Sequence, residues 1–230
     1  MSRYVSKLVN SLSDDSMGLG LGSGSSTSTN NDNNYNNYNN GCQRLLLRLC
    51  PADPNLTLIH PAGYPVDAPP LYTAIISSDK VSLYRGYINP GNLVGTTSTS
   101  SLSHSATLSL YGQQMPMKMS QMSGNFTLQW PPPSSSSTGT GTTLKWKPDQ
   151  MTGSSLELFD GSGSGSGRKL AKLKSSKSMM SSSSERGFEI NVPCDELFLN
   201  MVLLSGLAAK VGTKKNNEAA SEVIQALVGS

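Results

Sequence analysis

The chain has 230 residues, of which 36% are hydrophobic and 14% are charged, and its net charge is +3. Much of the length is therefore uncharged polar sequence, which cannot bury enough apolar area to offset chain entropy. Such sequence is typical of tails and loops around a smaller folded unit. The small net charge gives no reason to expect a nucleic-acid partner.

The first 41 residues are predicted to be a disordered tail, because residues 18–41 are rich in Ser and Asn and show no helical or strand period. The N-terminal residues before this Ser- and Asn-rich tract contain no apolar segment of signal-peptide quality, so we expect a protein inside the cell. The N-x-T sequons at Asn55 and Asn125 matter only in a secreted chain. The odd number and irregular spacing of the cysteines favour free thiols over disulfides or a zinc site; they are Cys42, Cys50 and Cys194.

Segments with a period of two residues predict β-strands along the body of the chain. Residues 71–76 and 81–87 flank a Ser-Ser-Asp-Lys turn, which indicates a hairpin. In 143–147 and 188–192, apolar residues alternate with polar ones, so each segment has one apolar face. About nine short strands at even spacing favour an antiparallel sandwich or barrel over βαβ units. The other strands are expected at 104–112, 115–122, 125–130, 155–160 and 168–174, and long polar loops at 131–141, 161–167 and 175–184.

The run from Asp195 to Gly212 is apolar on nearly every side when it is plotted as a helix. A surface helix has a polar face, so this one is buried in protein or in lipid. Its apolar part, 197–211, is shorter than the ~20 residues that span a bilayer, which favours burial in protein. The preceding strands are the available wall, and closing them around the helix removes their edges. The expected core residues of this helix, placed at 195–210, are Leu197, Phe198, Met201, Val202, Leu203, Leu204 and Leu207.

The order of four segments resembles the tubby C-terminal-like fold of tubby-like proteins, phospholipid scramblases and LURP-one-related proteins, and is most like uncharacterised fungal members. The segments are "LYTAIISSDKVSLYRG", "LKWKPDQMTGSSLELFD", "RKLAKLK" and "GFEINVPCDELFLNMVLLSGLAAK". The resemblance covers roughly Leu56 to Val211. It implies a mainly β fold, a closed antiparallel barrel of about twelve strands around a hydrophobic C-terminal helix. We therefore expect this domain at 42–212, between the tail 1–41 and an extra amphipathic helix at 213–230.

The sequence offers no arrangement of catalytic or metal-binding residues. His60 and His104 lie far apart without an acidic partner at motif spacing. Cys194 stands at the expected helix start, where Asp195 and Glu196 oppose formation of its thiolate. The resembled family has no common enzymatic activity, and we expect a protein that is not an enzyme and that has no cofactor or metal.

The candidate binding site is a group of basic residues in one strand-like segment. Cations near a membrane surface contribute about 1 kcal/mol each toward binding anionic headgroups, and some domains of the resembled family bind phosphoinositides. The more frequent interpretation of such a segment is a solvated strand face whose lysines prevent edge pairing. The candidate residues are Arg168, Lys169, Lys172 and Lys174.

Two functions follow as hypotheses. The first is a cytoplasmic protein, peripheral at a membrane, that binds anionic phospholipid headgroups and has no transmembrane segment. The alternative is a structural or protein-interaction scaffold that is regulated through its Ser-rich disordered segments.

Overall fold

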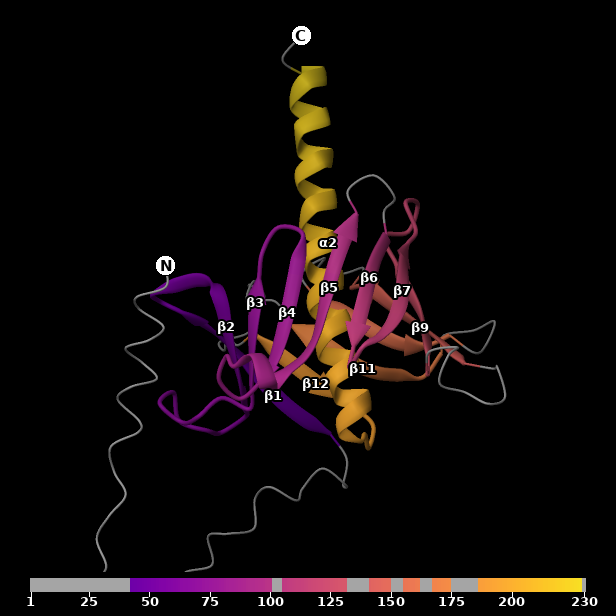
Figure 1. Cartoon of the computed structure of the whole chain (residues 1–230). Coiled ribbons are helices and arrows are strands. Elements are labelled where there is room, and N and C mark those ends of the chain that lie inside the picture. Colours follow the sequence, from indigo (N-terminus) through magenta and orange to yellow (C-terminus); the bar gives the residue numbers. More distant parts are fainter. Residues whose placement is uncertain are drawn as a thin grey trace, which may run out of the picture. The chain divides into compact units, whose positions relative to one another are not determined.

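The computed structural model describes residues 42–100, 105–131, 141–149, 155–161, 167–174 and 186–228. Within them, twelve strands form one closed antiparallel barrel, and one long helix, α2 (Glu196–Val228), runs through it and projects beyond one end (Figure 1). The predicted fold class is confirmed. The predicted tail 1–41 and most of the three predicted loops lie outside the described residues.

Every strand of the barrel pairs with its neighbours in the sequence, and β1 pairs with β12 to close the sheet. Closure leaves no strand edge exposed. The strands are β1 (Gln43–Cys50), β2 (Asp53–Pro61), β3 (Tyr72–Ile76), β4 (Lys80–Arg85), β5 (Leu93–Ser100), β6 (Ser105–Leu110), β7 (Gln113–Met119), β8 (Phe126–Trp130), β9 (Thr142–Pro148), β10 (Leu156–Asp160), β11 (Lys169–Lys174) and β12 (Gly187–Ile190); a 3-10 turn, η2 (Pro90–Asn92), precedes β5.

Three strands, β1, β2 and β5, are absent from the nine segments predicted by alternation; β1 begins at Gln43, before the resemblance starts and within the predicted domain 42–212. The sequence of β1 has three consecutive leucines, which obscure the period of two. That of β5, LVGTTSTS, is mostly polar. Its Thr97 is nevertheless only 1% exposed, and its hydroxyl accepts a hydrogen bond from the backbone N–H of Val81 at 3.1 Å. A satisfied hydroxyl can be buried at low cost, which is why this strand looks like loop sequence.

The barrel interior is filled by α2 and by the inward side chains of the strands. Met201, Val202, Leu203, Leu204 and Leu207 are all completely buried, as predicted. The strand residues that alternation places inward are also buried; they are Trp146, Leu156, Leu158, Phe188 and Ile190.

Two small residues let α2 pass close to the wall. A Cβ on Gly206 would lie 2.7 Å from Cε1 of Phe188 and 3.0 Å from Cζ2 of Trp146. One position earlier, the hydroxyl of Ser205 accepts a hydrogen bond from the indole N–H of Trp146 at 2.9 Å, so the polar atoms of this buried pair are satisfied.

The first turn of α2 lies at the barrel end, which corrects one of the predicted core residues. Asp195 caps the helix by accepting a hydrogen bond from the backbone N–H of Phe198 at 2.7 Å. Leu197, in this first turn, is 46% exposed and does not belong to the core. Phe198 is partly buried and meets Trp130 edge to face, with ring centroids 6.1 Å apart. Helical periodicity identifies the apolar residues of the helix but does not show which of its turns lie outside the barrel.

The helix also continues where a second helix was predicted. α2 has no break between the predicted helices 195–210 and 213–230. Thr213 sits one turn beyond Ala209 and donates its hydroxyl hydrogen bond to that residue's carbonyl at 2.9 Å. By length and composition, the part from Glu196 to Glu218 could cross a membrane, and 61% of the most apolar window in it is buried inside the protein.

Candidate functional site

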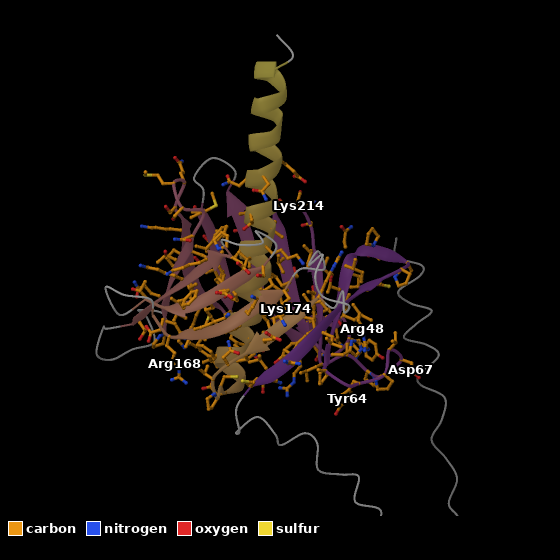
Figure 2. All side chains as sticks on the ribbon, turned by 180° about the vertical axis from the view of Figure 1, so that it is seen from behind. Arg48, Tyr64, Asp67, Arg168, Lys174 and Lys214 are labelled. Carbon is orange, nitrogen blue, oxygen red and sulfur yellow. The ribbon has the colours of Figure 1, made fainter. Side chains whose placement is uncertain are left out.

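The predicted basic residues lie on and beside β11, with their side chains on the outside of the barrel. Ala171 and Leu173 of this strand face inward and are buried. Successive strand residues point to opposite faces, so Lys172 and Lys174 face outward. Arg168 precedes the strand and is exposed. Figure 2 shows Arg168 and Lys174 on the side of the molecule opposite to the view of Figure 1.

Carboxylates of the neighbouring strands neutralise three of these four residues. Glu157 on β10 accepts hydrogen bonds from Nζ of Lys169 at 2.5 Å and from Nζ of Lys172 at 3.1 Å. Lys174 donates to Glu189 on β12 at 2.6 Å. The sequence alone does not reveal these pairs, because they depend on strand register.

The register aligns opposite charges in a row across five strands. Lys147 on β9 lies opposite Glu157, which lies opposite Lys172; Lys172 in turn lies opposite Glu189, and Glu189 opposite Arg44 on β1. Opposite charges directly across a strand pair stabilise a sheet modestly. This row therefore supports the pairing of β9 to β12 and the closure onto β1.

The ion pairs also change the ionisation of the groups in this row. Burial disfavours the charge of Glu157, but the hydrogen bonds from Lys169 and Lys172 outweigh it and lower the pKa of Glu157. Burial likewise disfavours the charge of Lys172, and the carboxylates of Glu157 and Asp149 reverse that effect and raise the pKa of Lys172. Both groups stay charged at neutral pH.

Three cations of the same outer face have no ion pair within the described part of the chain: Lys145 and Lys147 on β9, and Arg168. The ammonium of Lys147 lies 4.7 Å from the ring centroid of Phe159, a cation–π contact that leaves the charge available to an anion. The outer face thus combines a row of charges that neutralise one another with three cations that remain available to bind an anion.

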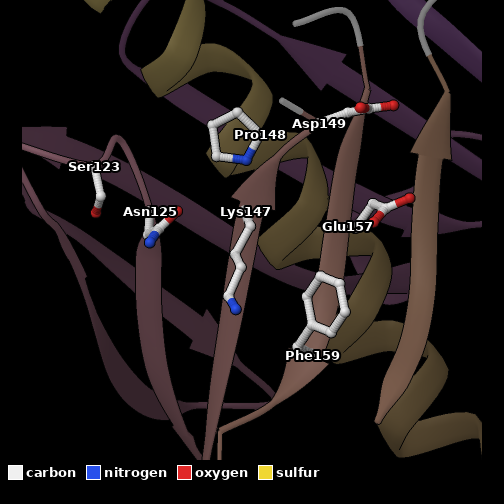
Figure 3. Close-up of a pocket in the computed structure, with 7 residues that line it drawn as sticks. All are labelled: Ser123, Asn125, Lys147, Pro148, Asp149, Glu157 and Phe159. Atoms are coloured by element: carbon white, nitrogen blue, oxygen red, sulfur yellow. The ribbon is translucent and has the colours of Figure 1, made fainter. Parts of the chain in front are cut away.

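A shallow groove of about 590 Å³ lies beside Lys147 (Figure 3). Ser123 and Asn125, from the turn before β8, contribute a hydroxyl and an amide to it. In Figure 3 the carboxylates of Asp149 and Glu157 are turned to one side, away from Ser123 and Asn125. The groove therefore offers hydrogen-bond donors and one cation on one side and paired carboxylates on the other. It is lined by Ser123, Asn125, Lys147, Pro148, Asp149, Glu157 and Phe159.

The groove is not predicted from the sequence. Asn125 is noticeable there only as part of a sequon, and Lys147 only as the polar partner in an alternating strand. Pairing of Phe126 with Trp146 brings the turn before β8 next to the end of β9, and no local pattern indicates that pairing.

The remaining candidate residues lie apart from this face or outside the described chain. His60 is completely buried, with Nε2 3.0 Å from the carbonyl oxygen of Ala68, and burial lowers its pKa. Burial, with the charge of Asp195, raises the pKa of the Cys194 thiol, which agrees with the expected unreactive cysteine. His104 lies outside the described residues. Among the described residues, no group of three or more His, Cys, Asp or Glu could hold a metal ion.

Comparison of the chain with protein-family models, with curated proteins and with solved structures gave no match.

Proposed function

We propose that this chain is a non-enzymatic, tubby-like protein that binds anionic phospholipid headgroups at a cytoplasmic membrane surface. The fold supports the proposed family, because that family combines a closed barrel of about twelve strands with a central C-terminal helix. The observation that carries the proposed activity is the available ammonium of Lys147 beside a groove that also contains Ser123 and Asn125.

The ion pairs on β10 to β12 determine which cations would contact the headgroup. A phosphate at Lys169 or Lys172 has to compete with Glu157, which already bonds both lysines. Lys145 and Lys147 form no ion pair among the described residues, and Glu157, which lies opposite Lys147, is already bonded to the lysines of β11. We therefore place the direct contacts on β9 and at Arg168. The lysines of β11 add long-range attraction, which salt screens.

Vesicle sedimentation tests this proposal. Vesicles of phosphatidylcholine with a few per cent of phosphatidylinositol bisphosphate should bind the wild type, and binding should weaken as sodium chloride is raised. The double substitution Lys145→Gln/Lys147→Gln should weaken binding roughly 30-fold, since each cation contributes about 1 kcal/mol and 1.4 kcal/mol is a factor of ten.

The matched control removes the same charge elsewhere on the barrel. Lys80→Gln/Arg85→Gln replaces the two exposed cations at the ends of β4, five strands away from β9. It should leave vesicle binding within about twofold of the wild type. If the two double variants lost binding equally, the attraction would depend on net charge alone, and the proposed site on β9 would be wrong.

A second function, a protein-interaction scaffold, is favoured by a different observation. Four large side chains near the start of α2 are between 43% and 56% exposed: Tyr87, Leu93, Tyr111 and Leu197. Exposed aromatic and leucine side chains in one region are typical of contact surfaces. A photo-crosslinker at Leu197 should then capture a defined protein partner, whereas one at the fully exposed Met122 should not.

A further inference from the structure

Three lysines of α2 lie where the helix leaves the barrel. Ala208 and Ala209 are completely buried, and Lys210 is the first charged residue after them, with its side chain still partly buried. Lys214 and Lys215 follow within about one helical turn, and Nζ of Lys215 donates to the hydroxyl of Thr99 on β5 at 3.2 Å. The position of Lys210 at the rim is therefore fixed by the packing of the helix below it.

Arg186 lies at the same level of the barrel as Lys210. Gly206 is in contact distance of Phe188 on β12, and Lys210 is four residues beyond Gly206, or about 6 Å along the helix axis. Arg186 is two residues back from Phe188, a similar distance in the same direction along an extended chain. The backbone carbonyl of Arg186 accepts a hydrogen bond from the N–H of Leu47 at 2.8 Å, which holds this residue against β1.

The two cations have no carboxylate partner in the part of the chain that the structure describes. Two carboxylates of the same elements are engaged by other lysines: Glu189 bonds Lys174, and Glu218 lies 3.6 Å from Lys214 on the exposed part of the helix. Burial lowers the pKa of Lys210, and the positive charge of Arg186 lowers it further. Two like charges, both partly buried, therefore lie at one level of the barrel with no carboxylate partner among the described residues.

We propose that Arg186 and Lys210 form a binding site for an oxyanion of the phosphate or sulfate type at the end of the barrel where α2 leaves. A guanidinium and an ammonium are the groups that bind such anions in proteins, the first in a bidentate manner and the second as a point charge. A bound oxyanion supplies the negative charge that the surroundings of Lys210 lack. Lys214, one turn beyond Lys210 on the same helix face, is paired with Glu218 and is not assigned to the site.

This site is separate from the face on β9 to β11 and does not rest on the proposed lipid binding. A phosphate group reaches it either on a soluble molecule or on a lipid headgroup. Pyrophosphate and phosphoinositide vesicles serve as the two probes, because only the second presents the phosphate on a membrane.

The test measures the melting temperature with increasing sodium pyrophosphate, at an ionic strength held constant with sodium chloride. The wild type should show a saturable rise, because a ligand that binds only the folded state stabilises it by mass action. Lys210→Met keeps the buried stem and removes the charge. It should weaken the apparent affinity for pyrophosphate at least tenfold. In chloride alone it should melt no lower than the wild type, because an uncompensated, partly buried charge has been removed.

The control Lys145→Met makes the same change at a lysine on the outer face of β9 and should keep the wild-type response. If Lys210→Met does not fold, Arg186→Gln replaces it. In addition, labelling of Lys210 in the wild type by trinitrobenzenesulfonate, followed by peptide mapping, should be slowed by pyrophosphate.

A wild type that pyrophosphate stabilises no more than chloride would overturn the site, as would a Lys210→Met variant with an unchanged response. A response that arises only after Glu185→Gln would also overturn it, because the chain would then supply its own counter-ion next to Arg186. Lys145→Gln/Lys147→Gln should keep the pyrophosphate response, so failure of the lipid proposal and failure of this site are distinguishable. Vesicle binding that Lys210→Met also weakens would assign the phosphate to a lipid, and unaltered vesicle binding would assign it to a soluble molecule.

Discussion

The two ends of α2 differ in how their charged groups are paired. Where the helix begins, Asp195 caps it, Glu196 forms an ion pair with Arg85 of β4, and Nδ2 of Asn200 donates to the hydroxyl of Tyr111 at 2.7 Å. Where the helix leaves the barrel, Arg186 and Lys210 have no carboxylate partner among the described residues. Charges that the protein pairs itself hold the fold together, whereas unpaired charges indicate where an anion can bind.

Tyr111 shows how the barrel is tied to α2 at the end where the helix begins. It has a φ of 47° in the two-residue turn between β6 and β7, followed by Gly112 with a φ of 81°. Asn or Gly is the usual residue at the first of these positions, because a bulky side chain is strained there. Its hydrogen bond to Asn200 ties the turn to the helix and offsets part of that strain.

The largest effect that would sharpen this comparison is expected from Leu203→Ala. Leu203 is completely buried between the two ends, and its loss should lower the free energy of unfolding by ~2 to 5 kcal/mol through lost burial and a cavity. Leu197→Ala, on the exposed first turn of the same helix, should cost about 0.5 kcal/mol or less. Urea denaturation of both variants measures the difference. Equal losses would show that the helix is not enclosed as the barrel requires.

A smaller effect is expected from filling the close contacts of the helix glycines. Gly206→Ala places a methyl group 2.7 Å from the Phe188 ring in the middle of the barrel, and overpacking of this kind costs about 1 to 3 kcal/mol. Gly212→Ala meets the ring of Phe126 at 2.8 Å, nearer the end where the helix leaves.

At Gly212, two contributions to the free energy of unfolding oppose each other: the steric contact with Phe126 and the higher helix propensity of alanine. The ring of Phe126 lies near the rim and can move aside more easily than Phe188, and Ala is favoured over Gly inside a helix by about 1 kcal/mol. We therefore expect Gly212→Ala to be close to neutral in thermal melting. If it destabilised as much as Gly206→Ala, the two ends would be packed with equal rigidity, contrary to the comparison.

The sequence predicts the inside of this barrel far better than its outside. Alternation identifies Trp146 and Phe188 as inward residues because the interior requires apolar side chains at every second position. The helix is found for the same reason, since only an enclosed helix is apolar all round. β5 is missed because its buried positions include Thr97 and Gly95, whose suitability depends on neighbours far away in the sequence.

The candidate sites could not be predicted because they depend on the register between strands and on the height of each residue along the barrel axis. Lys169 and Lys172 form a basic segment in the sequence, but the bulge between Leu158 and Phe159 lets both reach Glu157. Arg186 and Lys210 are 24 positions apart, and only the contact of Gly206 with Phe188 brings them to one level. The sequence indicates that cations are present, and the fold decides which of them lack a partner.

The smallest expected effect concerns pH and the loop at the end where α2 begins. His60, near the end of β2, is buried, and its Nε2 donates to the carbonyl of Ala68 while Nδ1 has no partner among the described atoms. Arg48 donates to the carbonyls of Tyr64 and Pro65 in the same loop, at 2.7 and 2.8 Å. Burial first, and the charge of Arg48 in addition, lower the pKa of His60, so the folded protein holds this histidine neutral.

The direction of the pH effect follows from which state takes up the proton. Histidine in the unfolded chain titrates near pH 6.5, and the folded protein takes up this proton only at lower pH, so stability falls as the pH decreases below about 6.5. His60→Gln places an amide N–H where Nε2 donates and cannot titrate, so the midpoint of urea unfolding should change less between pH 7.5 and 5.5 than in the wild type. His104→Gln, at the other histidine of the chain, should keep the wild-type slope. If His60→Gln kept the wild-type slope, another group would carry the pH dependence, and the loop at this end would not be held by a neutral histidine.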